Sequence, residues 1–319
     1  MAVALVGPTA SGKSAVALAV ARARPGPGGV ELVSVDSMAV YRGMDIGTSK
    51  PSAGVRAEVP YHLVDLVDPD EEFAVTRFQE AARQALEGIT TRGGQALLVG
   101  GTGLYLRAVT DDLSFPGRFP TVASELTHEL DRLGPEGSDH RLAGCAELHA
   151  RLQRLDPVAA TRIEPGNERR LVRALEVTLG SGRPFSSFGP GLERYPPSRF
   201  ALLGVRRDAD ESDRRIAERF AHMMDEGLLD EVRALAARPA GVSKTARQAL
   251  GYRELLTHVE DGVPLGTAVD EAVRRTRAFA KRQRAWFRRD PRIEWIDPDE
   301  DPVATVAGRL DRDASVSHR

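Results

Sequence analysis

One short stretch near the start of the chain, GPTASGKS at residues 7–14, constrains the fold more than any other segment. It follows the apolar run AVALV and has the spacing G-x-x-x-x-G-K-[ST] of a phosphate-binding loop between a buried strand and a helix. Backbone N–H groups in such a loop form an anion site, and the helix dipole adds to it. Lys13 is expected to reach the terminal phosphate, and Ser14 to bind Mg²⁺. The loop residues are Gly7, Pro8, Thr9, Ala10, Ser11, Gly12, Lys13 and Ser14.

Strand-like and helix-like patterns alternate after this loop. Such alternation is typical of an α/β protein with a parallel sheet, here a P-loop NTPase-like core. Ligands of these sheets bind at the carboxyl ends of the strands. Residues 7–14, 36–41 and 100–102 all follow predicted strands, so we expect them to meet at one site. Strands are predicted at residues 2–7, 30–35, 62–67, 96–99 and 199–208.

From about residue 115 the strand-like alternation stops, and helical spacings dominate until about residue 184. We interpret residues 115–192 as a helical insertion domain. Residues 1–114 plus 193–319 would form the α/β core with its C-terminal helices. Long helices are predicted at residues 212–237, 246–259 and 266–289, and the tail after residue 301 is expected to be loosely ordered.

Composition excludes several classes of protein. Cys145 is the only cysteine, which excludes an internal disulfide framework and a multi-cysteine zinc site. No apolar run approaches the roughly 18 residues that a membrane span needs. The N-terminus has no basic region before its apolar run, so we expect no signal peptide, no membrane contact and a cytoplasmic location. The formal net charge of −2 shows that the chain as a whole is not strongly basic.

Residues 36–51, DSMAVYRGMDIGTSKP, form a polar, glycine-containing segment that is too long for a tight turn. Long loops without regular structure tend to be functional. Asp36 ends the preceding strand-like run and is expected either to bind a metal ion or to face a substrate. The turn GGTGLY at residues 100–105 is expected to let the backbone approach a ligand closely and to present the Thr102 hydroxyl.

The segment VRRTRAFAKRQRAWFRR, residues 273–289, is predicted to be a helix with two basic stripes. Stripes of one charge indicate contact with nucleic-acid phosphates, and the alternative is an arginine-rich helix paired with acids elsewhere. The first stripe is Arg274, Arg277, Lys281, Arg284 and Arg288, and the second is Arg275, Arg282 and Arg289. The apolar face is expected to consist of Val273, Thr276, Ala280 and Phe287.

Two further groups of arginines lie on predicted helices. Arg215 and Arg219 are four residues apart on one face, as the lid arginines of phosphoryl-transfer enzymes are. An N-cap signal at Asn167 precedes a second group, for which RNA contact and structural ion pairing are both open. That group is Arg169, Arg170 and Arg173.

Five segments together resemble the motifs of one family. In order along the chain these are GPTASGKS, DSMAVYRGMDIGTSKP, LVGGTGLYL, RRLVRALE and AKRQRAWFR. They resemble the bacterial tRNA dimethylallyltransferases, also called tRNA isopentenyltransferases, from Val3 to about Trp295. The resemblance implies transfer of a dimethylallyl group from dimethylallyl pyrophosphate to the exocyclic N6 amine of the adenine 3′-adjacent to the anticodon. The partner would be the anticodon arm of a tRNA, the loop would hold the donor's pyrophosphate with Mg²⁺, and the enzyme would be a monomer.

The resemblance also implies roles for single residues. Asp36 would be the general base, Thr102 would contact the donor or the adenine, and Lys13 and Arg219 would bind the pyrophosphate. RNA contacts are expected, from the resemblance and the basic stripes together, at Asp36, Ser37, Met38, Ala39, Tyr41, Thr102, Arg169, Arg170, Arg173, Arg247, Gly251, Tyr252, Arg277, Lys281 and Arg284.

The chain departs from the family pattern at several positions that bear on RNA recognition. Members usually carry glutamine in place of Ala39, histidine in place of Tyr61 and tyrosine in place of Phe279. They also carry HPND where EPGN begins at Glu164, and an arginine near Thr127. The pyrophosphate-binding residues follow the pattern.

Three other functions remain open on the residues. A small-molecule P-loop kinase or phosphotransferase would share the loop and the lid arginines, but not the basic stripes. An adenylate isopentenyltransferase would perform the same chemistry on a free nucleotide. A non-catalytic RNA-binding protein would not need Lys13, Ser14 and Asp36.

Overall fold

The computed structural model describes residues 2–189, 191–297 and 299–316. The chain forms two compact units: a core unit, Met1–Asp112 with Pro196–Arg319, and an insertion unit, Leu113–Tyr195. The bounds of the insertion unit differ by a few residues from the helical insertion expected at 115–192.

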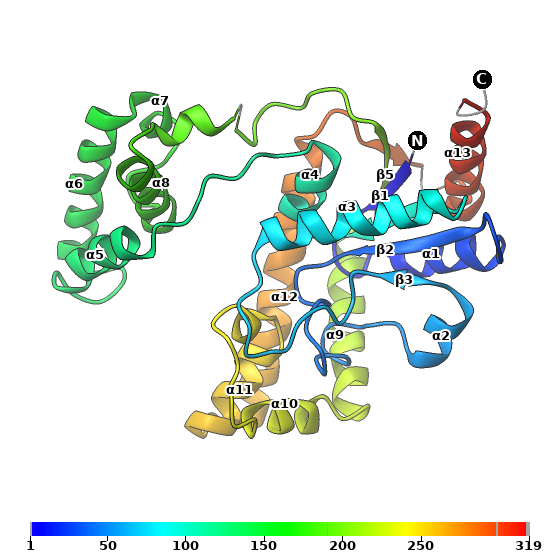
Figure 1. The fold of residues 1–319 in the computed structure, drawn as a ribbon. Helices are drawn as coiled ribbons and strands as arrows, with labels where there is room; N and C mark the ends of the chain where they lie inside the picture. The colour runs from blue at the N-terminus through cyan, green and yellow to red at the C-terminus, as the bar shows by residue number, and fades with distance from the viewer. Residues whose placement is uncertain (1, 190, 298, 317–319) are drawn as a thin grey trace. The chain divides into compact units, whose positions relative to one another are not determined.

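The core unit is built on a parallel sheet with the strand order β3-β2-β4-β1-β5-β6 (Figure 1). In the described residues the strands are β1 (Ala2–Val6), β2 (Val30–Val35), β3 (Tyr61–His62), β4 (Gln95–Gly100), β5 (Phe200–Val205) and β6 (Glu294–Ile296). Strands of a parallel sheet are apolar throughout because helices cover both faces. Successive residues of β1 therefore enter different apolar clusters, Val3 and Leu5 on one face and Ala4 and Val6 on the other. The predicted parallel α/β sheet is confirmed.

Helices cover both faces of this sheet. On one face α1 and α13 pack together, and Val20 and Val306 are fully buried there. On the other face α3, α4 and α12 pack around Phe78, Leu106 and Phe287. The described helices of the core unit are α1 (Lys13–Arg22), α2 (Ala53–Glu58), α3 (Val75–Thr91), α4 (Gly103–Thr110), α9 (Ala209–Asp225), α10 (Leu228–Ala236), α11 (Tyr252–Asp261), α12 (Leu265–Arg288) and α13 (Pro302–Val316), with a 3₁₀ turn η2 (Ala246–Gln248).

The insertion unit is helical and has an apolar core of its own. Leu130, Leu152 and Leu171 are fully buried in it, and Cys145 is buried there as a free thiol. The predicted N-cap is confirmed, because the Asn167 side chain accepts the N–H of Arg170 at 3.3 Å. Its described elements are α5 (Pro120–Asp131), α6 (Asp139–Leu155), α7 (Pro157–Ala160), α8 (Glu168–Ser181) and the 3₁₀ turn η1 (Phe185–Phe188).

Several predicted elements are wrong in extent. The strand predicted at 62–67 ends at His62, because Leu63 (φ 64°) and Asp65 (φ 55°) leave the extended region. The helix predicted at 212–237 begins at Ala209 and is interrupted at Gly227 (φ 100°), which separates α9 from α10. The helix predicted at 246–259 begins only at Tyr252.

The tail was expected to be loosely ordered, which is wrong for its described part. Residues 302–316 form α13, because Val306 and Leu310 complete the apolar layer between the sheet and α1. Residues 317–319 lie outside the described residues.

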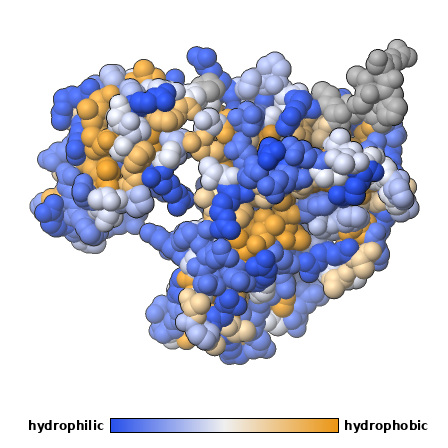
Figure 2. All heavy atoms as spheres, in the orientation of Figure 1, coloured by the Kyte–Doolittle hydropathy of each residue, from blue (hydrophilic) through white to orange (hydrophobic). Residues whose placement is uncertain are grey.

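Hydrophilic residues cover most of the face shown in Figure 2. Apolar atoms reach the surface over α6, where Leu142 and Leu155 are exposed. Among the described residues, each helix is too short or too polar to cross a membrane.

Candidate active site

The phosphate-binding loop joins β1 to α1 through two residues with left-handed backbone, Ala10 (φ 62°) and Gly12 (φ 94°). A left-handed alanine costs about 1–2 kcal/mol, and local strain of this kind clusters at functional sites. Gly7 is needed for close approach, because a Cβ there would lie 2.8 Å from Ser11 Oγ and 2.9 Å from the Val205 carbonyl oxygen. The loop is therefore a constrained nest of backbone N–H groups, as anion binding requires.

Two cations meet at this loop. The Lys13 ammonium donates to the Pro8 carbonyl oxygen at 3.1 Å. Arg219 on α9 donates to the Thr9 hydroxyl at 2.7 Å. Burial lowers the pKa of Lys13 to about 8; the Asp36 carboxylate opposes this shift and the Arg219 charge adds to it. Burial also lowers the pKa of Arg219, again against the effect of Asp36.

Asp36 follows β2 and lies within the electrostatic reach of both cations. Its Oδ1 accepts the N–H groups of Met38 (2.8 Å) and Ala39 (3.4 Å), which orients the carboxylate. Thr102 lies at the N-cap position of α4 after β4, and its hydroxyl accepts the N–H of Ser37 at 3.3 Å. The three segments predicted to meet at the carboxyl ends of the strands therefore do so.

Sequence reasoning missed two residues at the loop. Gln283 on α12 is buried, and its side chain accepts the N–H of Thr9 and donates to the Gly101 carbonyl oxygen, both at 2.8 Å. Arg207 follows β5 and donates to the Ser11 carbonyl oxygen at 3.3 Å. Signals for both existed, since Gln283 interrupts the apolar face of its helix and Arg207 follows a strand end.

Two glycines of the GGTG turn lie against side chains of α12. A Cβ on Gly101 would lie 2.3 Å from Gln283 Nε2, and one on Gly103 would lie 2.1 Å from Trp286 Nε1. These glycines let α12 pack closely against the turn, and approach of a ligand to the turn backbone stays a prediction. The Thr102 side chain in this turn is partly exposed.

Comparison with known proteins places this site in a family. A model described as IPP transferase matches residues 39–290. The chain is 44% identical over 298 residues to the tRNA dimethylallyltransferase of Desulforudis audaxviator, covering 93% of this chain and 92% of that protein. The chain belongs to the IPP transferase family.

Other members of the IPP transferase family agree in sequence and fold. Identity to the tRNA dimethylallyltransferase of Salinispora arenicola is 46% over 295 residues, or 92% of this chain and 82% of that protein. The crystal structure of the full-length tRNA isopentenylpyrophosphate transferase from Bacillus halodurans has a TM-score of 0.66 and 34% identity, over 99% of both chains. The predicted P-loop NTPase-like core is confirmed.

The segment after Asp36 contains more buried and ion-paired side chains than its polar sequence suggests. Tyr41 is fully buried, and the side chain of Lys50, only 1% exposed, pairs with Asp45 (2.7 Å) and Asp65 (2.6 Å). Ala39 is also buried. The side chains of Tyr41 and Ala39 are therefore enclosed by the protein itself, whereas Ser37 and Met38 remain partly exposed, and RNA contact at these positions stays a prediction.

The same enclosure is found at residues 251–252. Gly251 and Tyr252 are buried at the start of α11. The Tyr252 hydroxyl donates to Glu231 at 2.5 Å and accepts the N–H of Gly47 at 3.1 Å. Tyr252 thus supports the 36–51 segment through Gly47, and RNA contact at Gly251 and Tyr252 stays a prediction. Arg247 is partly exposed and pairs with Glu260.

The predicted arginines of the insertion unit differ in their surroundings. Arg169 and Arg170 are exposed on the first turn of α8. Arg173 pairs with Glu176 at 2.8 Å and donates to the Pro116 carbonyl oxygen at 2.9 Å. Structural pairing thus occupies Arg173, and two guanidinium groups remain on the surface.

The basic helix α12 is confirmed with its apolar face, since Thr276, Ala280 and Phe287 are buried. Its stripes are only partly available. Arg274 pairs with Glu271 at 2.6 Å, and Arg275 pairs with Glu254 at 3.0 Å. Arg277 donates to the Asp213 carbonyl oxygen at 3.3 Å, and Arg284 is partly buried. On α12 and the residue after it, the exposed basic side chains without an ion pair among the described residues are Arg277, Lys281, Arg282, Arg288 and Arg289.

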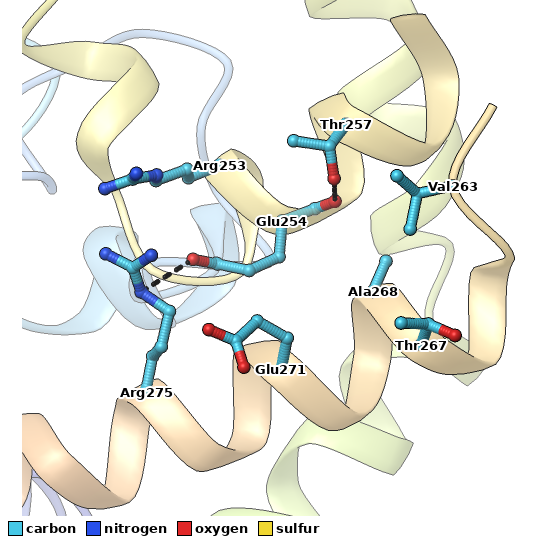
Figure 3. A pocket seen from close by; sticks show the side chains of 8 residues that line it. All are labelled: Arg253, Glu254, Thr257, Val263, Thr267, Ala268, Glu271 and Arg275. Carbon is cyan, nitrogen blue, oxygen red and sulfur yellow. Dashed lines mark hydrogen bonds and ion pairs between the residues drawn. The ribbon is translucent and has the colours of Figure 1, made fainter. Parts of the chain in front are cut away.

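A pocket of about 210 Å³ lies between α11 and α12 (Figure 3). Acids and bases compensate one another in it, because Arg275 pairs with Glu254 and Glu271 pairs with Arg274. None of its lining residues belongs to the phosphate-binding loop. The lining is Arg253, Glu254, Thr257, Val263, Thr267, Ala268, Glu271 and Arg275.

The described residues contain no group of three or more His, Cys, Asp or Glu side chains that could hold a metal ion. Ser14, the predicted Mg²⁺ ligand, is exposed at the start of α1. A cation at this loop would need its other ligands from water and a bound phosphate group, as is common for Mg²⁺ in proteins.

Proposed function

We propose that this chain transfers a dimethylallyl group from dimethylallyl pyrophosphate to the N6 amine of the adenine 3′-adjacent to the anticodon of tRNAs. The observation that carries the proposal is the meeting of two cations, Lys13 and Arg219, with the Asp36 carboxylate at one strand edge. The named relatives, which match over nine-tenths of this chain, support the same reaction.

The geometry suits the departure of pyrophosphate. As the bond between the allylic carbon and the pyrophosphate oxygen breaks, negative charge grows on the leaving group. Lys13, Arg219 and the loop N–H groups stabilise that charge. Mg²⁺, held by the Ser14 hydroxyl together with the donor's phosphates, would supply further positive charge. The pyrophosphate then leaves with the electron pair of the broken bond.

The acceptor amine needs a base. Its lone pair is delocalised into the adenine ring, so it is a weak nucleophile until a neighbouring group takes its proton. Oδ1 of Asp36 accepts the N–H groups of Met38 and Ala39, which leaves the second carboxylate oxygen for the amine proton. That oxygen receives the proton as the new carbon–nitrogen bond forms. An adenine within a stacked anticodon loop must first turn out into the site.

The alternatives make different demands on the same site. A small-molecule kinase leaves the exposed basic residues of α12 without a role. An adenylate isopentenyltransferase does the same, because a free nucleotide is far shorter than this helix. The basic helix therefore favours RNA over both.

One assay tests the proposal and the role of Asp36. The protein is incubated with labelled dimethylallyl pyrophosphate, Mg²⁺ and bulk tRNA, and the modified nucleoside is identified after digestion. Labelled N6-dimethylallyl adenosine from tRNA is expected. Label on free adenine nucleotides alone, or phosphate transfer from ATP alone, would reject the proposal.

The Asp36→Asn variant is measured in the same assay over a range of Mg²⁺ concentrations. Loss of a general base lowers turnover by roughly 10²–10⁴-fold, with donor affinity nearly unchanged. Recovery of activity at high Mg²⁺ would instead make Asp36 a metal ligand.

A further inference from the structure

One buried amide joins the two halves of the candidate site. Gln283 is 7% exposed, and its Oε1 accepts the N–H of Thr9 while its Nε2 donates to the carbonyl oxygen of Gly101. Its two partners lie 274 and 182 residues away along the chain. We call these two hydrogen bonds the Gln283 clamp.

The clamp requires a donor and an acceptor at once, on the two ends of one planar group. Among side chains of this length only an amide supplies both: glutamate offers only acceptors when ionised, and leucine offers neither. The fit is also tight, because Gly101 has no room for a Cβ beside Gln283 Nε2. Both the residue and its neighbour are therefore specified by the contact.

Each end of the clamp continues into a reacting part of the site. At one end, the Thr9 hydroxyl accepts a hydrogen bond from Arg219. The charge of Arg219 acts on Lys13 and lowers its pKa. At the other end, Gly101 precedes Thr102, whose hydroxyl accepts the N–H of Ser37 next to Asp36. The clamp thus sets the spacing between the pyrophosphate side and the base side.

We propose that Gln283 is a positioning residue for the transfer reaction, which holds the phosphate-binding loop in register with Thr102 and Asp36. The inference rests on the proposed function. Alignment of the donor carbon with the acceptor amine depends on this register, whereas binding of either substrate alone does not. A displacement of about 1 Å costs on the order of 10²-fold in rate, so the loss should fall on kcat.

The test compares variants of the full-length protein. Gln283→Leu removes both hydrogen bonds, and Gly101→Ala displaces the amide from the other side. Thr276→Val is the matched control: Thr276 is buried on the same face of α12, but its hydroxyl donates only to Ala272 of its own helix. The measurements are kcat, KM for the donor, tRNA affinity and melting temperature.

Gln283→Leu and Gly101→Ala are each expected to lower kcat by about 10²-fold, with KM and tRNA affinity little changed. The double variant should be no slower than the slower single variant, because both changes break one contact. Thr276→Val should lower the melting temperature and leave kcat unchanged. An unchanged kcat in Gln283→Leu, or a loss in Thr276→Val of equal size, would overturn the proposal.

A second readout separates this inference from the proposed function. Hydrogen exchange of residues 7–14 is expected to accelerate in Gln283→Leu and not in Thr276→Val. If the wild-type protein prenylates no RNA, the proposed function fails, and exchange still decides whether the clamp holds the loop. Equal exchange in all three proteins would reject the clamp.

Discussion

The surroundings of Lys13 disfavour its protonated form. Burial lowers its pKa to about 8, and Arg219 adds to the effect although Asp36 opposes it. The ammonium form attracts a phosphate group more strongly than the neutral amine, so binding of an anion at this loop should weaken as pH rises through this pKa. Asp36 offsets part of the cost of placing two cations together, and an anionic ligand between them would offset more of it.

The pH dependence of the donor reaction follows from this pKa. The ammonium is lost as pH rises through the pKa, so kcat/KM for dimethylallyl pyrophosphate should be level below about pH 8 and fall above it. The profile is measured from pH 6 to pH 10 at saturating tRNA. Lys13→Arg should lose the inflection, whatever its absolute rate, because a guanidinium stays protonated throughout. A wild-type profile that stays level to pH 10 would contradict the pKa and the role together.

At the scale of elements, the 36–51 segment is supported by α10 and α11. The Glu231 carboxylate on α10 accepts the N–H groups of Asp45 and Ile46 at 2.9 Å each, and also the hydroxyl of Tyr252. One carboxylate thus satisfies several donors of a loop that has no regular structure. The loop that begins at Asp36 is thus held by residues of α10 and α11, which are distant from it in the sequence.

Removing that carboxylate should loosen the loop. Glu231→Gln keeps one acceptor oxygen but turns an amide N–H₂ toward backbone donors, leaving them unpaired at a cost of about 1–3 kcal/mol. The free energy of unfolding is measured by denaturant titration. Asp230→Asn is the control: it lies next in the chain, is exposed, and pairs only with Arg233 in the described structure, so a change within about 0.5 kcal/mol is expected. Equal stability of the two variants would show that Glu231 does not support the loop.

Over the whole molecule, basic and acidic residues nearly balance, with a formal net charge of −2. RNA binding must therefore depend on where the unpaired basic groups lie. On α12 and the residue after it, the exposed basic side chains without an ion pair in the described structure are Arg277, Lys281, Arg282, Arg288 and Arg289, because Arg274 and Arg275 are paired with glutamates.

The salt dependence of tRNA binding distinguishes the unpaired basic residues of α12 from those paired with glutamates. Replacing Lys281 and Arg288 with alanine should reduce the slope of log affinity against log salt by about one unit for each lost phosphate contact. Arg274→Ala serves as the control and should leave the slope nearly unchanged, because Glu271 already pairs with that charge. Binding is measured by filter retention over a series of salt concentrations. Identical slopes in the three proteins would remove α12 from the RNA-binding surface.

Local patterns in the sequence determined the phosphate-binding loop, the parallel sheet and the apolar face of α12. Each depends on residues close together in the chain: a fixed spacing around Lys13, apolar runs bounded by glycine, and a helical period. The meeting of Asp36 and Thr102 with the loop followed from the rule that strand ends gather at one edge.

Only the tertiary structure decided which polar residues support this site from within. Gln283, Lys50 and Glu231 are ordinary polar residues in sequence, and Tyr41 resembles a surface contact until its burial is known. The physical reason is that a buried polar group needs a partner, and that partner can lie anywhere along the chain. Spacing specifies the face of a helix or strand, whereas packing alone specifies what that face meets.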